Sequence, residues 1–370
     1  MRTKLGIITA LFGMLLANCG TEVTESPQTD AAEAVPADTL RYPQEVHLKN
    51  IRQLTFGGDN AEAYWSFASD ALVFQATNPS WEIPCDQIFI MELGENAKPL
   101  PQRPTPVSTG LGRTTCAYFM PGDSAFVYAS THLGDAECPP VPPRGPNGEY
   151  VWPIYPDYDI FVANRNGEIT QQLTNLPGYD AEATVSPKGD RMVFTSTRSG
   201  DLELYTCDLD GGNVVQVTDE LGYDGGAFFS PDGEWLIWRA SRPQTEEEQA
   251  HYMDLLSQGL VEPTDMELFI GRADGSEVRQ LTDLGGANWA PYFHPNGERV
   301  IFCSNHHTGG FPFNLFSIRT DGSDLEQITF DDAFDSFPMF SPDGKYISFS
   351  SNRHNGRTRS TNVFVAEWIE

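Results

Sequence analysis

The sequence predicts an all-β fold, a six-bladed β-propeller built from four-stranded antiparallel blades. Three observations support this prediction. A short turn recurs along the chain, strand-like sequence flanks each copy, and the last copy lacks a strand whose sequence occurs nearer the N-terminus. Repeats of this kind are typical of small β-sheets arranged radially around an axis.

The repeated turn has four clear copies and two weaker ones. The clear copies read Ser-Pro-Lys-Gly, Ser-Pro-Asp-Gly, His-Pro-Asn-Gly and Ser-Pro-Asp-Gly, at 186–189, 230–233, 294–297 and 341–344, and the weaker ones lie at 67–70 and 120–123. From Pro121 onward, successive turn prolines are spaced 66, 44, 64 and 47 residues apart. A propeller blade takes roughly 40–45 residues, so the two long spacings contain insertions of about 20 residues.

One blade shows the expected order of strands. An inner strand at 183–185 leads through the turn to a second strand at 191–196 and a third at 203–208. Asp210 and Gly211 then turn the chain into a fourth strand at 214–218, and glycine supplies the positive φ that such a hairpin requires. Most of the fourth strands contain Gln-Leu-Thr or a close variant of it.

The last blade predicts how the ring closes. Its third strand, 362–366, is followed by no Gln-Leu-Thr strand, whereas 51–55 reads Ile-Arg-Gln-Leu-Thr and precedes the first blade. The N-terminal strand is therefore predicted to pair with the C-terminal strand, which removes the exposed sheet edges of an open array.

The N-terminal region predicts export. Residues 1–19 have a charged start, a short apolar core and the ending Leu-Ala-Asn-Cys, which resembles a bacterial lipoprotein processing site with Cys19 as the lipidated residue. Asn18 departs from the usual small residue, so ordinary signal cleavage is the alternative. Residues 20–45 are predicted to be a disordered tether and 46–370 the propeller. Gly20 after the cysteine favours periplasmic exposure on a lipid anchor in the outer membrane of a Gram-negative bacterium.

The turns, the Gln-Leu-Thr strands, Ser-Asn-Arg at 351–353 and the lipoprotein-like start resemble the TolB-type β-propeller repeat family over about residues 50–370. The resemblance implies a periplasmic binding platform. The same propeller also accompanies peptidases and polysaccharide lyases, so it implies fold more than function. The net charge of −29 argues against nucleic acid as a partner.

Two sets of polar residues recur at equivalent blade positions, before and after the turn, and we expect both on the face around the central channel. The predicted ligand-binding residues are Asn60, Asp180, Asp224, Asn288, Asp335, His132, Arg198, Arg242, His306, His307 and Arg353. The first set also includes Thr114, and the second Asn78. The alternative is structural, because Asp–Arg pairs at matched positions commonly lock adjacent blades together.

Both insertions are predicted on this face. Residues 133–157 are rich in proline and aromatic residues, whereas 243–267 contain a capping box, Thr245 with Glu248, and a helix stop at Gly259. We interpret them as a lid made of one loop and one helix, with surface decoration as the alternative.

The cysteines predict one disulfide. Cys85, Cys116 and Cys138 map to this face, and a bridge between two of them would fix the proline-rich loop, although the sequence leaves the pairing open. A zinc site is the alternative, without the paired Cys-x-x-Cys spacing that typifies one. Cys207 and Cys303 lie in strand patterns and are predicted to be buried.

The sequence predicts no catalytic residue. It contains neither a Gly-x-Ser-x-Gly elbow nor a His-Glu-x-x-His helix. His132 and His306 fall in opposite blades, too far apart for one ion. We therefore predict no cofactor, and a divalent metal near His306 and His307 is the alternative to a polar loop that lines the pocket. We therefore predict a cell-envelope binding or scaffolding module for a protein or peptide partner. The alternatives are a metal-dependent, lyase-like carbohydrate-active enzyme and a non-catalytic glycan or small-molecule binder.

Overall fold

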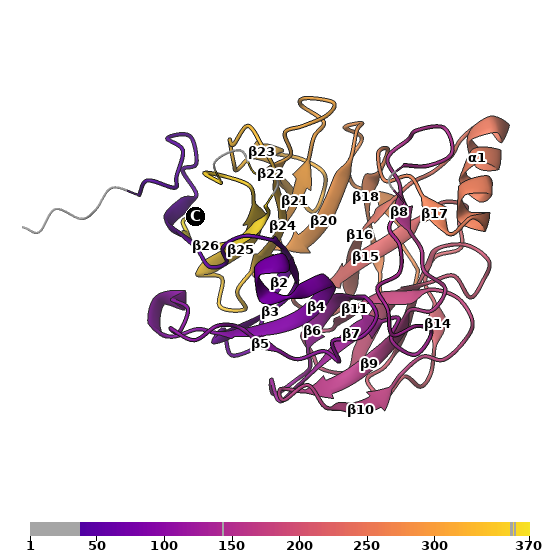
Figure 1. The fold of residues 1–370 in the computed structure, drawn as a ribbon. Coiled ribbons are helices and arrows are strands. Elements are labelled where there is room, and N and C mark those ends of the chain that lie inside the picture. The colour runs from indigo at the N-terminus through magenta and orange to yellow at the C-terminus, as the bar shows by residue number, and fades with distance from the viewer. Residues whose placement is uncertain (1–37, 143, 356–357, 359) are drawn as a thin grey trace, which may run out of the picture. The chain divides into compact units, whose positions relative to one another are not determined.

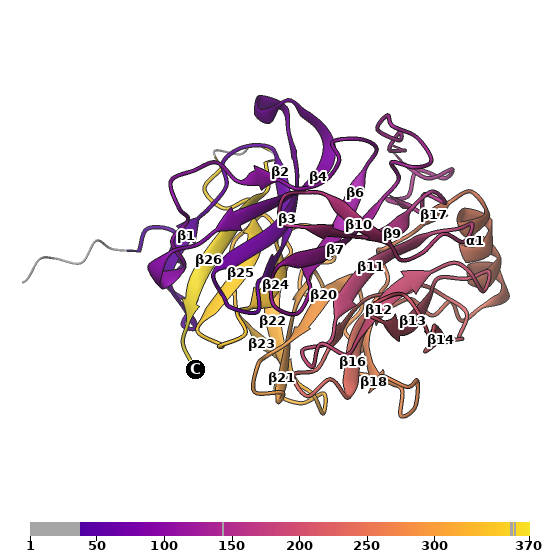
Figure 2. The same cartoon turned by 90° about the horizontal axis from the view of Figure 1, so that it is seen from below.

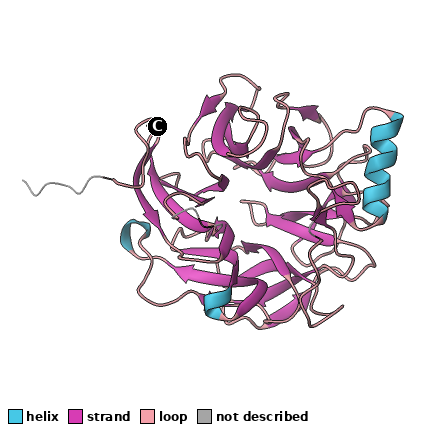
Figure 3. Ribbon diagram, turned by 45° about the horizontal axis from the view of Figure 1, so that its top comes forward, coloured by secondary structure: helices cyan, strands magenta, loops and turns pink. Residues whose placement is uncertain are grey.

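The computed structural model describes residues 38–142, 144–355, 358 and 360–370. Six four-stranded antiparallel sheets stand around a common centre (Figure 1, Figure 3), which confirms the predicted six-bladed propeller. The predicted signal peptide, residues 1–19 with Cys19, lies outside the described residues. No helix in the described part of the chain has the length and apolar composition needed to cross a bilayer.

The first three blades are consecutive in sequence. Blade 1 contains β2 (Asp59–Trp65), β3 (Ala71–Asn78), β4 (Ile83–Glu92) and β5 (Thr105–Pro106), with the 3-10 helices Pro79–Trp81 and Glu95–Ala97. Blade 2 contains β6 (Thr114–Phe119), β7 (Ala125–Ser130), β9 (Asp159–Asn164) and β10 (Ile169–Gln172). Blade 3 contains β11 (Asp180–Val185), β12 (Arg191–Ser196), β13 (Glu203–Asp208) and β14 (Val215–Gln216).

The remaining blades follow the same order. Blade 4 contains β15 (Asp224–Phe229), β16 (Trp235–Ala240), β18 (Glu267–Arg272) and β19 (Arg279–Gln280). Blade 5 contains β20 (Asn288–Phe293), β21 (Arg299–Ser304), β22 (Asn314–Arg319) and β23 (Glu326–Gln327). Blade 6 contains β24 (Asp335–Phe340), β25 (Tyr346–Ser351), β26 (Asn362–Trp368) and β1 (Leu48–Gln53).

Blade 6 closes the ring as predicted. β1 pairs antiparallel with β26, with Gln53 opposite Phe364. The pairing continues beyond the strand, because the Leu54 amide donates to the Val363 carbonyl at 2.8 Å. Figure 2 shows β1 beside β26 at one side of the ring.

The threonine of the Gln-Leu-Thr strand has a repeated structural role. Its hydroxyl accepts a hydrogen bond from a backbone amide near the start of the third strand. The donors and acceptors are Ile160 and Thr174, Leu204 and Thr218, Leu268 and Thr282, Leu315 and Thr329, and Val363 and Thr55, at 2.8–2.9 Å. Blade 1 uses Ser108 with the Ile88 amide at 2.9 Å. The motif therefore satisfies a backbone donor that would otherwise be buried without a partner.

The folded body begins earlier than the predicted residue 46. Asp38 accepts a hydrogen bond from the Ile51 amide at 3.0 Å, and the Tyr42 hydroxyl donates to Asp331 at 2.6 Å. Glu45 is fully buried and paired with Arg353 at 3.0 Å. Residues 38–45 were predicted as tether because they lack a hydrophobic period, but specific polar contacts hold them against blade 6.

The two insertions form one small unit. β8 (Trp152–Pro153) pairs antiparallel with β17 (Leu260–Val261), and the Ile154 amide donates to the Gly259 carbonyl at 2.7 Å. The predicted helix is α1 (Glu246–Ser257), capped by Thr245 and Glu248. Figure 3 shows this helix at the periphery of the ring.

Every inner strand has a register shift near its middle, where one residue has positive φ. These residues are Glu62, Cys116, Glu182, Gly226, Ala290 and Phe337, with φ between 48° and 62°. Positive φ is uncommon outside glycine, so its recurrence in all six blades indicates a built-in bulge.

Candidate functional site: the mouth face and the axis

We call the end of the ring where the inner strands begin the mouth face, and the end that carries the repeated turns the turn face. Three of the predicted acidic residues on the mouth face pair with the predicted arginines. Asp180 accepts from Arg198 at 3.0 Å, and Asp224 accepts two hydrogen bonds from Arg242 at 2.7 and 2.8 Å. Arg353 donates to Asp335 at 2.9 Å and to Glu45.

These pairs connect strands within one blade. Each aspartate begins the inner strand and each arginine follows the second strand of the same sheet. The alternative of an Asp–Arg lock between adjacent blades was therefore wrong for these three pairs, because each hydrogen bond lies within one blade. Each guanidinium also packs over an aromatic ring of its own blade, as Arg242 does over Phe269 at 4.7 Å.

In blades 2 and 5, where a histidine replaces the arginine, a serine at the end of the second strand contacts the histidine ring. Ser304 donates to Asn288 at 2.7 Å and contacts His306 Nδ1 at 2.8 Å, while His132 Nδ1 contacts Ser130 at 2.9 Å. In blade 1 the amides of Asn60 and Asn78 donate to the carbonyl of Gly57, at 2.9 and 3.0 Å. The imidazoles pack on rings of their own blades, at 4.6 Å from Phe161 for His132 and 4.5 Å from Phe316 for His306.

Burial limits what this set of residues can bind. Asn60, Asp224, Asn288 and Asp335 have no exposed surface, and Arg353 is 1% exposed. Burial raises the pKa of Asp224 to about 6, against the hydrogen bonds from Arg242. Asp180 is also buried, whereas His132, Arg198, Arg242 and His306 are half-buried and His307 is exposed. A ligand could reach those five without opening a blade.

A polar cluster on the axis was missed by the sequence analysis. Glu182 accepts hydrogen bonds from Thr195 at 2.8 Å, from Tyr223 at 2.9 Å and from the Gly226 amide at 3.0 Å, and it forms an ion pair with Arg239. Arg239 also donates to the Tyr223 hydroxyl at 2.6 Å. The cluster joins blades 3 and 4 across their inner strands.

A second carboxylate lies in the same region. Burial raises the pKa of Glu62, and the negative charge of Glu182 raises it further, while a hydrogen bond from Cys116 acts in the opposite direction. Burial also raises the pKa of the Cys116 thiol well above its ordinary value, so this cysteine is an unreactive thiol at neutral pH. Tyr64 donates to Glu62 at 3.0 Å.

Aromatic rings pack around the axis on the turn-face side of these residues. Tyr64 lies 5.5 Å from Tyr118 and 5.8 Å from Phe228, and Phe228 lies 5.2 Å from Tyr292. These positions lie two residues beyond the positive-φ bulge in their strands. The same counting from the turn proline would have located both layers. Four of the six blades carry an aromatic ring in this layer, whereas the residues at the bulge differ in chemistry from blade to blade.

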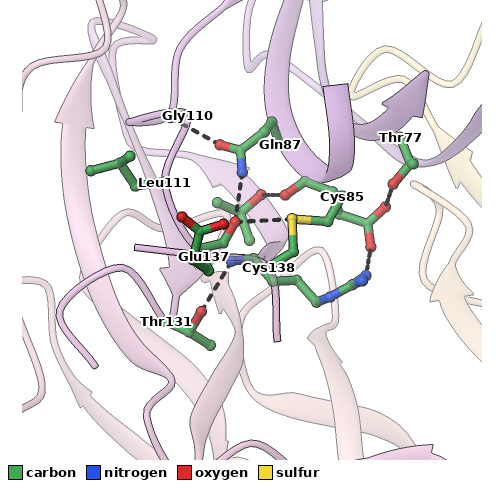
Figure 4. The surroundings of a disulfide bond; sticks show 12 residues. Thr77, Cys85, Gln87, Gly110, Leu111, Thr131, Glu137 and Cys138 are labelled. Carbon is green, nitrogen blue, oxygen red and sulfur yellow. Dashed lines mark hydrogen bonds and ion pairs between the residues drawn. A yellow bond between two sulfur atoms is a disulfide. The ribbon is translucent and has the colours of Figure 1, made fainter. Parts of the chain in front are cut away.

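The proline-rich loop covers the axis on the mouth face. The ring of Trp152 in β8 lies 5.2 Å from the Arg239 guanidinium and 5.1 Å from the ring of Trp289. A disulfide between Cys85 and Cys138 fixes the start of this loop to blade 1. Figure 4 shows the disulfide beside Gln87, which donates to the Gly112 carbonyl at 2.9 Å.

The disulfide resolves the pairing that the sequence left open. Cys116 is buried and free, as are Cys207 and Cys303. The zinc alternative was wrong for these three cysteines, because two of them are joined to each other. Among the residues described, no group of three or more His, Cys, Asp or Glu side chains is placed to hold a metal ion, and His307 contacts Asn314 at 3.0 Å.

Aromatic residues continue from Trp152 across blades 5 and 6. We call this set the mouth strip: Trp152, Trp289, Phe311, Phe313 and Phe334. Successive rings lie 5.1 Å (Trp152 to Trp289), 4.5 Å (Trp289 to Phe313) and 5.6 Å (Phe313 to Phe334) apart. Phe311 packs against Phe313 and Phe334 and is 76% exposed.

Comparison with known families agrees with this architecture. Residues 146–264 match the family model described as PD40, TolB beta propeller domain. The fold is a TolB-type β-propeller. This confirms the resemblance that the repeated motifs indicated. Among curated proteins, none matches the chain.

Several solved structures share the TolB-type fold. A putative TolB from Agrobacterium tumefaciens is 20% identical, with 85% of this chain and 91% of that chain covered and a TM-score of 0.54. TolB from Acinetobacter baumannii is 17% identical, with 82% and 64% covered and a TM-score of 0.54. The tricorn protease is 18% identical, with 85% and 26% covered and a TM-score of 0.51. Similarity at this level of sequence identity shows a shared propeller fold.

Proposed function

We propose that this TolB-type propeller is a binding or scaffolding module of the cell envelope that recognises a protein or peptide partner on its mouth face. The observation that carries the proposal is the mouth strip. Phe311 is 76% exposed, yet it contacts the two phenylalanines beside it. Exposed aromatic residues on an ordered base are typical anchors of protein interfaces.

The groups beside the strip suit a peptide. His307 and the half-buried His306 offer polar groups in the same loop as Phe311. Peptide recognition combines apolar anchors with a few oriented polar groups, and both are present here. The strongly acidic chain favours a partner surface that is basic or neutral.

Site-specific photo-crosslinking tests this proposal. A benzophenone amino acid replaces Phe311 in the full chain, which is expressed in its native host and irradiated. The matched control carries the same group at Val215, which is 53% exposed on the outer strand β14. We expect one discrete adduct with an envelope protein from position 311 and none from position 215.

The partner is then identified and its affinity measured against purified protein. Phe311→Ala with Phe334→Ala should weaken binding by about 2 kcal/mol or more, as expected for two anchor residues. Phe311→Ala alone should leave the melting temperature nearly unchanged, because Phe311 is exposed, and the double variant should still melt cooperatively. Equal adducts from both positions, or unchanged affinity in the double variant, would contradict the proposal.

The lipid anchor belongs to the same proposal. Two or more acyl chains on Cys19 would hold the propeller stably at the periplasmic side of a membrane. Cys19→Ser should abolish incorporation of labelled palmitate and move the protein from the membrane fraction to the soluble fraction. A Cys19→Ser variant that stays with the membrane would show that another contact anchors it.

A further inference from the structure

A cleft of about 440 Å³ opens on the turn face between blades 4 and 5. Its buried floor consists of Ile270 and Phe293, and Trp235 stands at its side. The polar residues at the rim are Ser230, Asp232, Arg279, Asn296, Thr320 and Asp321. Trp235 belongs to β16, Ile270 to β18 and Phe293 to β20, and Figure 2 shows where these strands lie in the ring. This site is separate from the mouth strip, and nothing in the proposed function uses it.

Neighbouring blade junctions explain why a cleft exists here. In blades 3 and 6 the first residue of the second strand contacts the last residue of the next blade's inner strand. In blade 3 this residue is Arg191, which lies over Phe229 at 5.7 Å and donates to the Gly233 carbonyl at 2.9 Å. In blade 6 it is Tyr346, which stacks on Trp65 at 6.1 Å.

Trp235 is the equivalent residue of blade 4, and it behaves differently. Its contact is with Arg272 of its own blade, whose guanidinium lies 4.2 Å from the ring centre. Among the residues that the structure describes, no ring contact joins Trp235 to Phe293, although both line the cleft. The indole packs against the hydrophobic core and Arg272, and the cleft lies beside it.

Several polar atoms at the rim of the cleft have no hydrogen-bond partner within the described part of the chain. Asp232 and Asp321 each use Oδ1 within their own turns, accepting from Ser230 at 2.5 Å and from Ser323 at 2.6 Å. Asn296 likewise accepts from the Glu298 amide at 3.0 Å through Oδ1. Within the described part of the chain, no hydrogen bond reaches Oδ2 of either aspartate or involves Nδ2 of Asn296.

The charged residues at the rim favour a neutral ligand. A cationic ligand would meet Arg279, and an anionic ligand would meet both aspartates, so neither is matched by the rim. A neutral ligand with many hydroxyl groups can donate to the free carboxylate oxygens and accept from the asparagine amide. Its C–H face can pack against the electron-rich face of an indole.

We propose that the cleft between blades 4 and 5 binds a neutral saccharide. The volume of about 440 Å³ falls in the usual range of small-ligand sites, about 300–1,000 Å³. Trp235 supplies the platform for a pyranose ring, and Asp232, Asn296 and Asp321 hold its hydroxyl groups. The ligand binds without chemical change.

Binding of defined oligosaccharides tests the proposal. Maltotetraose, cellotetraose and the N-acetylglucosamine tetramer serve as neutral probes, with a galacturonate tetramer and a glucosamine tetramer as charged probes. Saturation-transfer NMR and calorimetry on the full chain measure binding. We expect at least one neutral probe to bind and the two charged probes to bind about tenfold more weakly or not at all.

The repeat provides matched control variants. Asp232→Asn keeps the turn hydrogen bonds and should weaken binding several-fold, whereas Asp343→Asn, the same position in blade 6, should leave it unchanged. Trp235→Ala should weaken binding about tenfold, with Tyr346→Ala as its control. Melting temperatures show whether each variant is folded, and the Asp232→Asn comparison decides the matter if Trp235→Ala unfolds.

Three results would overturn the proposal. The first is no binding of any neutral probe at about 10 mM. The second is a preference for either charged probe. The third is equal loss of binding in Asp232→Asn and Asp343→Asn, which would place the saccharide elsewhere. None of these results affects crosslinking at Phe311, so failure here is distinct from failure of the partner proposal.

Discussion

The paired aspartates and arginines on the mouth face act first as internal ties of a blade. Asp224 receives hydrogen bonds from Arg242 and from the Trp238 indole, and it has no exposed surface. Removing it would leave the buried Trp238 indole N–H without its acceptor and would take from Arg242 its most buried carboxylate partner.

We therefore expect Asp224→Ala to lower the free energy of unfolding by about 3–5 kcal/mol. Glu220 gives a matched control, since it pairs with the same Arg242 at 3.2 Å but its side chain is 72% exposed. Glu220→Ala should cost about 1 kcal/mol or less. Urea unfolding measures both, and similar losses in the two variants would show that burial does not set the strength of these pairs.

Glu203 predicts a pH dependence. It begins β13, is 2% exposed, and burial raises its pKa to about 8. The unfolded chain releases this proton near pH 4.3, so between pH 4.3 and about 8 the folded state binds more protons and its stability falls as pH rises.

The variant Glu203→Gln should weaken this decline. We expect its unfolding free energy to depend less on pH than that of the wild type, by at most about 1.4 kcal/mol per pH unit in that window. Urea unfolding at pH 5, 6, 7 and 8 measures it. Parallel curves for the two proteins would mean that Glu203 does not titrate there.

Residue positions could be predicted better than residue contacts. Counting from the turn located Asp180 and Arg198, Asp224 and Arg242, and Asp335 and Arg353 correctly as recurring positions on one face. The count contained no information on whether the side chains point to a ligand or to each other. Glu182 and Arg239 come from different blades. Glu62 occupies the position of Glu182 in blade 1, but no other blade has an arginine at the position of Arg239, so no period could indicate their contact.

At the scale of elements, a disulfide and a short strand pairing hold the two insertions in place. The disulfide encloses a sequence separation of 53 residues and fixes the loop that carries Trp152. The pairing of β8 with β17 links the same loop to α1. The helix was predictable from its capping box, whereas the two-residue pairing was too short to show in a sequence pattern.

We expect Cys138→Ser to lower the free energy of unfolding by about 2–5 kcal/mol and to increase hydrogen exchange in residues 139–142 and 144–157. Exchange in β7 and β9 should change little. A reducing agent should destabilise the wild type to the level of the variant and leave the variant unchanged. If exchange rises across the whole propeller instead, the disulfide stabilises the ring and not the loop alone.

At the scale of the whole molecule, the ring depends on both ends of the folded body. β1 supplies the outer strand of blade 6, and residues 38–45 add the buried Glu45 to the Asp335 and Arg353 pair. The strand pairing could be predicted because Gln-Leu-Thr repeats. The Glu45 contact could not, because it involves a unique residue outside the repeat.

Two truncated variants test this dependence. A chain that begins at residue 38 should melt cooperatively near the temperature of the longer protein. A chain that begins at residue 56 lacks β1 and leaves the edge of β26 exposed, so we expect aggregation or a large fall in melting temperature. Size-exclusion chromatography and thermal melting measure both. Equal melting temperatures would show that the outer strand of blade 6 is dispensable.

The shared blade also sets when this protein can finish folding. β1 is made early in synthesis, but its only neighbour within the sheet, β26, is made last. Until residue 368 has emerged, the early strand lacks its neighbour and the ring stays open. We therefore expect a chain whose β26 has not yet paired with β1 to be more sensitive to proteases than the closed ring.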